Sequence, residues 1–420
     1  MPKFVFIIIL VLLFSSVYAQ DNERMDDLTF KIAVYGPNDE IFAWWGHAAL
    51  IINDANWYFE RVIDWGINSH PNESFVKDFI DGLIQYSVTS STHRVNTYIN
   101  EDRDVTIYTL NLDRHSKVIM LSYIENIILP ENRYYDYHEF LDNCATGVRD
   151  IIDLGTGGQF KAAFDSFPGR FSYRQHVLRY TWFRPLSDWI LSFLMGQNLD
   201  EQITPWDEMF LPVEIARNIV DFSYIDSSGV ERELVSSVQL INSSKNRLPV
   251  LNKPLVTWPF FMIAGFIIMI LLFLADGIQK KYPRLHKILM GISHSIFGLL
   301  FGLLGCILFF GLLMDNDYFQ QNINIVFINP LLLIIVPLGF LYAANKSILM
   351  DSGKLLQIIW SCVFIVSLVT LFLRMLPFFF QQNQSVYALI LPVAFALGNV
   401  PQLLFICIKK CKGYRALVKK

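Results

Sequence analysis

Charged residues are scarce in this chain: they make up 17 % of its 420 residues, whereas hydrophobic residues make up 53 %. A soluble domain usually carries about 25 % charged residues, which excludes a single ordinary globular domain. The small formal net charge of −4 gives no indication of a nucleic-acid partner, and we expect none. Cysteine is also scarce, with five in the chain, and no Cys-x-x-Cys pair indicates a zinc site. We therefore predict neither a metal nor a cofactor.

The few charges are unevenly distributed. Residues 255–420 hold four acidic and thirteen basic residues, a balance of +9, and Lys3 adds one positive charge. Residues 20–254 hold 34 acidic and 20 basic residues, a balance of −14. Two chemically different parts are therefore joined in one chain.

The first residues are typical of a secretory signal peptide. Lys3 precedes an apolar run from Phe4 to Phe14, and small or neutral residues continue up to Ala19. A charged start, an apolar centre and an A-x-A-like end predict cleavage after Ala19. We expect residues 1–19 to be removed. An uncleaved membrane anchor is the alternative, and either one directs the export of residues 20–254.

The C-terminal part, 255–420, is predicted to be an all-α membrane domain with five transmembrane helices. Each apolar run has the length of about 20 residues that crosses a hydrocarbon core. The runs are Val256–Ala275, Ile288–Met314, Ile323–Ala344, Leu355–Leu376 and Val386–Ile408. Basic residues gather after the first run, after the third run and in the tail, which places these three segments in the cytoplasm. Five crossings then place residues 20–254 outside, with the C-terminus cytoplasmic.

Arg374 stands near the outer end of the fourth run. Its side chain could extend to the interface simply to reach water. The alternative is that Arg374 binds the phosphate of a phospholipid in the outer leaflet, which would make it a substrate-binding residue.

The exported part, 20–254, is predicted to be one α+β domain. Its strands lie mostly before Cys144 and its helices mostly after it. The expected strands are Phe30–Tyr35, His47–Ile52, Trp57–Phe59, Val62–Trp65 and Val105–Leu110. The expected helices are Glu73–Leu83, Ser116–Leu129, Ala145–Leu154, Pro185–Met195 and Pro212–Val220. Residues 221–254 are predicted to form a polar strand pair and then a linker.

Cys144 is the single cysteine of this exported part. An oxidising compartment favours paired or absent thiols, so a lone thiol is notable. Asp142 or Asn143 is a good N-cap for a helix whose apolar face begins at Ala145. Cys144 then lies in the first turn, where the helix dipole stabilises a thiolate. The alternative is a small buried core thiol.

A thiolate nucleophile needs a general base, usually a histidine. The best candidate is His47, which opens an apolar strand after Gly46; the alternative is a packed core histidine. Asp64, in Ile63-Asp64-Trp65-Gly66, is a candidate to orient the His47 ring.

These motifs resemble the Lnb-type family of bacterial membrane proteins, which have an N-terminal periplasmic domain. The resembling segments are Gly46–Leu50, Asp64–Gly66, Asn143–Thr146 and Gly196–Pro212. The order of His before Cys is also similar to circularly permuted NlpC and papain-like folds, including lecithin–retinol acyltransferase. The resemblance implies a permuted papain-like domain with its cysteine at a helix N-terminus and its histidine on a strand.

The resemblance also implies lipoprotein N-acyltransferase activity in the bacterial inner membrane. An acyl chain of a phospholipid would pass through a thioester on Cys144 to the N-terminal Cys amine of a lipoprotein. Cys144 would be the nucleophile and His47 the base.

Two other functions fit the same residues. One is a periplasmic Cys–His hydrolase, such as a cell-wall amidase, a peptidase or a thioesterase. The other is a non-catalytic sensor anchored in the membrane.

Overall fold

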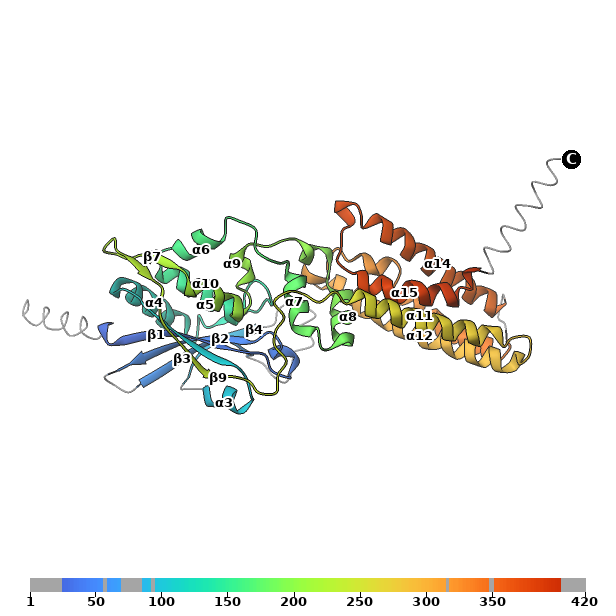
Figure 1. The fold of residues 1–420 in the computed structure, drawn as a ribbon, viewed down its shortest axis with the longest axis horizontal. Helices are drawn as coiled ribbons and strands as arrows, with labels where there is room; N and C mark the ends of the chain where they lie inside the picture. Colours follow the sequence, from blue (N-terminus) through green and yellow to red (C-terminus); the bar gives the residue numbers. More distant parts are fainter. Residues whose placement is uncertain are drawn as a thin grey trace, which may run out of the picture. The chain divides into compact units, whose positions relative to one another are not determined.

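The computed structural model describes residues 25–55, 59–68, 85–91, 95–314, 317–346 and 351–401 (Figure 1). The predicted signal peptide, the predicted helix Glu73–Leu83 and the C-terminal tail lie outside these residues. The chain divides into two compact units. The sheet unit comprises residues 1–180 and 202–250, and the helical unit comprises residues 181–201 and 251–420.

Among the described residues of the sheet unit, seven strands form the main antiparallel sheet, in the order β6-β4-β3-β2-β1-β5-β9. Among the strands predicted before Cys144, Phe30–Tyr35, His47–Ile52, Val62–Trp65 and Val105–Leu110 are confirmed, while the predicted strand Trp57–Phe59 lies mostly outside the described residues. The strands are β1 (Leu28–Tyr35), β2 (His47–Asp54), β3 (Phe59–Asn68), β4 (Gln85–Ser91), β5 (Val105–Leu110), β6 (Tyr134–Asp136) and β9 (Val235–Asn242).

Alternating side chains of the central strands build two hydrophobic layers. Phe30 and Ile32 of β1 point to one face, where they join a large core with α4, α5 and α10. Ala33 and Tyr35 point to the other face and pack with Val95 of the short helix α3. Figure 1 shows α4, α5 and α10 together on one side of the sheet and α3 on the other. The larger layer therefore carries α5, the helix that begins at Cys144.

Helices of the sheet unit lie mostly after the first five strands, as the α+β prediction expects. They are α3 (Val95–Asn100), α4 (Arg114–Ile127), α5 (Cys144–Gly155), α6 (Gln159–Phe164), α7 (Tyr173–Thr181), α9 (Pro205–Glu208) and α10 (Pro212–Val220). The predicted strand pair after residue 221 forms as β7 (Ser223–Ile225) and β8 (Glu231–Glu233). The sequence did not indicate that the next segment, β9, joins the main sheet as an edge strand.

The helical unit contains four candidate membrane spans among the residues that the structure describes. They are α11 (Trp258–Gly277), α12 (Pro283–Leu313), the segment Ile323–Ala343 with α13 (Ile335–Ala343), and α14 (Ser352–Leu373). Their outward apolar side chains suit lipid. The fifth predicted span begins in α15 (Gln384–Leu397), which has 14 residues, and continues beyond the described residues.

Three glycines spaced seven residues apart explain the close packing of α12 in this unit. A side chain at Gly291 would clash with the backbone of Gly339, one at Gly298 with the side chain of Ile335, and one at Gly305 with the backbone around Asn329. Small residues at helical spacing let membrane helices approach closely. The seam between α12 and the third span therefore depends on glycine.

Residues 181–201 belong to the helical unit, although the sequence placed them in the exported domain. They form α8 (Pro185–Leu194) and the turn η2 (Gln197–Asp200). The buried amide of Asn322 donates to the carbonyls of Phe193, Leu194 and Met195, over 2.9, 2.9 and 3.3 Å. Carbonyls at a helix end have no partner inside the helix and need one from elsewhere. Asn322 supplies it.

Replacing Asn322 tests this anchor. Asn322→Ala leaves buried carbonyls at the end of α8 unsatisfied, and each such group costs about 1–3 kcal/mol. We expect a lower thermal unfolding midpoint for the full-length protein in detergent. Gln279→Ala, at an exposed position, is the control and should behave like the wild type. An unchanged midpoint for Asn322→Ala would contradict the anchoring role.

Candidate functional site

Cys144 is the first residue of α5, as the sequence predicts, and Asn143 is its N-cap. The Asn143 side chain accepts hydrogen bonds from the amides of Ala145 and Thr146, over 2.8 and 3.0 Å. Thr146 in turn accepts from the Asn143 amide over 2.7 Å, completing a capping box. The start of α5 is thus fixed at one residue, with Cys144 in the field of the helix N-terminus.

His47 and Asp64 lie on the neighbouring strands β2 and β3. Their side chains meet through a contact of 2.7 Å between His47 Nε2 and Asp64 Oδ1. The Asp64 side chain is 1 % exposed and that of His47 is 17 % exposed. Because Nε2 is engaged by Asp64, Nδ1 is the ring nitrogen that remains for the thiol. Asp64 thereby holds the ring in one orientation.

The three residues meet where β2 and β3 separate. The two strands pair from Asp54 to Leu50, but the register goes no further toward His47. A methyl group at Gly66 would lie 3.6 Å from Cys144 Cβ and 3.9 Å from His47 Cε1, so both side chains border the same space. Gly66 has φ +101°, a conformation that favours glycine. The N-terminus of α5 therefore enters the gap between the strands.

The electrostatics of the pair favour a thiolate beside an imidazolium. Burial alone raises the pKa of the Cys144 thiol, but the His47 charge, its hydrogen bond and that of the Ala48 amide lower it below the ordinary value. Burial alone lowers the pKa of His47, but the Asp64 carboxylate and Cys144 raise it well above the ordinary value. Each group thus stabilises the charged form of the other.

The segment before α10 supports the start of α5. Asn143 Nδ2 donates to the carbonyl of Phe210 over 3.1 Å. Arg149 donates to the carbonyl of Trp206 over 3.2 Å, and its guanidinium lies 4.1 Å from the Trp206 ring centre. Both partners lie in Gly196–Pro212, one of the resembling segments. That segment therefore braces the helix that carries the cysteine.

Three tyrosines lie close enough to Cys144 for its charge to affect the pKa of their hydroxyl groups. Tyr86 on β4 stacks on Tyr137, with ring centres 4.2 Å apart, and pairs with Tyr135 on β6. Burial raises the pKa of all three, and the negative charge of Cys144 adds to the effect. Burial also raises the pKa of the nearby Glu139 to about 7. These tyrosines are consequently neutral at pH 7.

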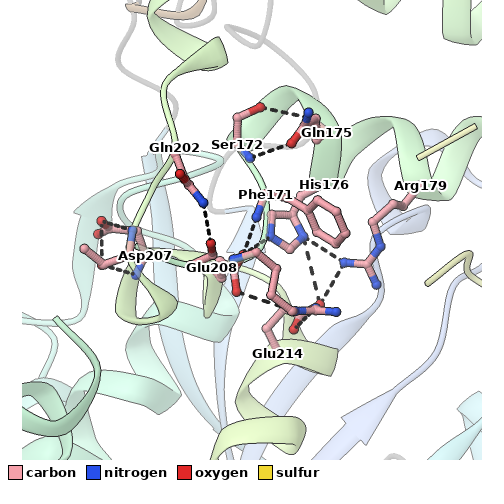
Figure 2. A network of polar contacts seen from close by, with 12 residues as sticks. Phe171, Ser172, Gln175, His176, Arg179, Gln202, Asp207, Glu208 and Glu214 are labelled. Atoms are coloured by element: carbon pink, nitrogen blue, oxygen red, sulfur yellow. Dashed lines mark hydrogen bonds and ion pairs between the residues drawn. The ribbon is translucent and has the colours of Figure 1, made fainter. Parts of the chain in front are cut away.

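A second buried histidine belongs to a separate polar network (Figure 2). His176 on α7 lies 3.0 Å from Glu208 Oε1 and 2.8 Å from the Arg179 guanidinium, which also bonds Glu214. Glu208 further accepts from the backbone amides of Arg170 and Phe171. Figure 2 shows these side chains converging from α7, α9 and α10. The network ties the helices of this region together.

Arg374 is the C-cap of α14 in the helical unit and is 9 % exposed. Its guanidinium lies 5.9 Å from the Tyr387 ring centre. Its contact with a phospholipid phosphate stays a prediction. Among the described residues, no group of three or more His, Cys, Asp or Glu side chains could hold a metal ion.

The structure thus brings Cys144, His47, Asp64 and Asn143 together. The sequence did not indicate the Ala48 amide or the space at Gly66, because both depend on the separation of β2 and β3. Nor did it indicate the tyrosines, which come from β4, from β6 and from the residue after β6. The spacing of Asn143 and Thr146 is a capping-box signal that could have been read.

Fold and site together define a membrane protein whose sheet unit holds a Cys–His–Asp constellation at a helix N-terminus. Residues 16–180 match the family model described as the Lnb N-terminal periplasmic domain. This match, over fewer than half of the residues of the chain, confirms the resemblance that the sequence shows. No curated protein and no solved structure gave a match. The chain is accordingly a membrane protein with a periplasmic N-terminal domain.

The pH dependence of Cys144 alkylation tests the charge pair. Because the pKa of Cys144 is lowered, a larger share of it than of an ordinary thiol is thiolate at pH 7, and iodoacetamide should label it faster there. In His47→Ala, burial and the Asp64 charge still raise the pKa of Cys144 and only the Ala48 bond lowers it, so we expect the rate at pH 7 to fall at least about tenfold. Asp64→Asn should give an intermediate profile.

Mass spectrometry of the Cys144 peptide separates this thiol from the other cysteines. Labelling of Cys306 and Cys362 in the same samples is the internal reference and should not respond to either substitution. An identical pH profile in the wild type and His47→Ala would show that the two side chains do not share charge.

Proposed function

We propose that this protein is a lipoprotein N-acyltransferase that uses Cys144 as nucleophile and His47 as general base. The observation that carries the proposal is the Cys144–His47 pair at the start of α5, in a chain with membrane-length helices. A phospholipid is the acyl donor and the N-terminal Cys amine of a lipoprotein is the acceptor. Both substrates reside in a bilayer, as this chain does.

In the first half-reaction the Cys144 thiolate attacks the carbonyl carbon of a phospholipid ester. The carbon–oxygen ester bond breaks, and His47 donates its proton to the departing lysophospholipid alkoxide. A thioester on Cys144 remains. Asn143 occupies the amides of Ala145 and Thr146, which leaves the first amide of α5 to stabilise the oxyanion.

In the second half-reaction the lipoprotein amine attacks the thioester. Neutral His47 takes the proton of the amine, the carbon–sulfur bond breaks, and the thiolate returns with the amide product. Asp64 acts on the ring in both steps, since its carboxylate holds Nε2 and stabilises the imidazolium. An environment of neutral aromatic groups favours transfer to an amine over water.

The permuted fold and the membrane topology are part of the same proposal. The sheet unit is a circularly permuted relative of papain, in which the strand histidine precedes the helix cysteine. The helical unit crosses the bacterial inner membrane five times, with the fifth crossing formed by α15 and the residues after it. The C-terminus is then cytoplasmic.

The N-termini of lipoproteins provide the test in cells. We expect N-acylated lipoprotein N-termini in cells with the wild-type chain, and free amines in cells with Cys144→Ser or His47→Ala. The measurement is mass spectrometry of the N-terminal lipopeptides. Gln239→Ala, an exposed substitution in the same unit, is the control and should support acylation.

The outcomes distinguish the other two functions. Unchanged N-acylation in Cys144→Ser cells would overturn the transferase. A change in cell-wall fragments without a change in lipopeptides would indicate a hydrolase. Full function of Cys144→Ser would indicate a non-catalytic sensor.

A further inference from the structure

The turn between β1 and β2 presents two large apolar side chains to solvent. Ile41 is 54 % exposed and Phe42 is 75 % exposed, and both lie on the 3-10 turn η1 (Ile41–Ala43). The turn is not part of either hydrophobic layer of the sheet unit. We call Ile41 and Phe42 the apolar tip.

Backbone and side-chain bonds hold the turn in shape. The Asn38 amide donates to the carbonyl of Ala43 over 2.9 Å, and the Trp44 indole donates to that of Asp39 over 3.0 Å. At the end of the turn, a side chain at Gly46 would lie 2.7 Å from the Tyr35 carbonyl oxygen, so the chain reverses there without room for one. The apolar tip is therefore presented by a fixed turn.

The turn is also bonded to the segment that leads to the first membrane helix. Arg247 donates to the Asn38 side chain and lies 3.0 Å from an Asp39 carboxylate oxygen. Trp258, the start of α11, comes a short stretch later, and an extended chain of that length reaches at most about 40 Å. The chain from Arg247 to Trp258 therefore limits how far the turn can lie from the start of α11.

The apolar tip lies beside the catalytic candidates in the chain. The turn leads directly into His47, and Leu141, which is 57 % exposed, shortly precedes Cys144. Exposed apolar side chains therefore precede both His47 and Cys144 in the sequence. The opposite end of the sheet, where Asn111 binds β8, carries the β7–β8 hairpin instead.

We propose that the apolar tip inserts into the interface of the bilayer that this chain spans. The occupant is lipid rather than a partner protein, because two side chains are far too few for a protein interface of about 1,000 Å². Phenylalanine and isoleucine gain from leaving water, and tethering keeps the bilayer within reach at all times. Arg247 offsets the charge of the adjacent Asp39. The docking does not depend on acyl transfer, but it brings lipid to the mouth of that site.

Photocrosslinking in the full-length protein tests the docking without reference to activity. p-Benzoylphenylalanine is placed at position 42, and at position 230 as the matched control, in protein reconstituted into phosphatidylglycerol and phosphatidylethanolamine nanodiscs. Val230 is 53 % exposed and lies beside β8, at the far end of the sheet. We expect phospholipid adducts by intact mass at position 42, in at least tenfold greater yield than at position 230. Equal yields would overturn the proposal.

A second measurement asks whether docking serves the proposed chemistry. Phe42→Ser should lower the rate of Cys144 acylation from vesicle phospholipid, relative to that from a soluble short-chain acyl thioester, by at least tenfold. Val230→Ser should leave this ratio unchanged. An unchanged ratio in Phe42→Ser would overturn a role in lipid access. Absence of Cys144 acylation from either donor would refute the transferase, while the crosslinking yields still decide the docking.

Discussion

The site depends on one constraint: the N-terminus of α5 enters the gap where β2 and β3 stop pairing. The capping box of Asn143 and Thr146 fixes the start of the helix, so the first side chain in the gap is Cys144. The separation of the strands frees the Ala48 amide to bond the thiol. His47 arrives from β2, and Asp64, on β3, binds its far nitrogen. Without the gap these groups would not share one space.

The charged groups of the site lie next to one another. The thiolate, the imidazolium and the Asp64 carboxylate form a line in which each neighbour has the opposite sign. Burial holds the tyrosines around them in the neutral form, and it raises the pKa of Glu139 to about 7. Because these charged groups are already in place, the surroundings need to rearrange little when a proton moves between them. The second buried histidine, His176, bonds to carboxylates and an arginine instead, and it has no thiol partner among the contacts that Figure 2 draws.

The sequence predicted the features that local chemistry determines. Alternation predicted β1 and β5, an apolar run predicted β2, and the cap before Ala145 predicted α5 with Cys144 in its first turn. The pairing of His47 with Cys144 and Asp64 followed from residue type, and the structure brings the three together. Features that depend on long-range contacts were not predictable. The Ala48 amide acts through strand separation, β9 joins an edge far away in sequence, and residues 181–201 pack in the helical unit through Asn322 and its neighbours.

The central claim is that Cys144 takes an acyl chain from a phospholipid, and the acyl-enzyme can be observed directly. Purified full-length protein, incubated with phospholipid vesicles that contain no lipoprotein, is examined by intact mass. We predict an added mass of one acyl chain, located on Cys144, released by hydroxylamine and absent in Cys144→Ser. No adduct on Cys144, in protein whose thiol still reacts with iodoacetamide, would contradict this claim.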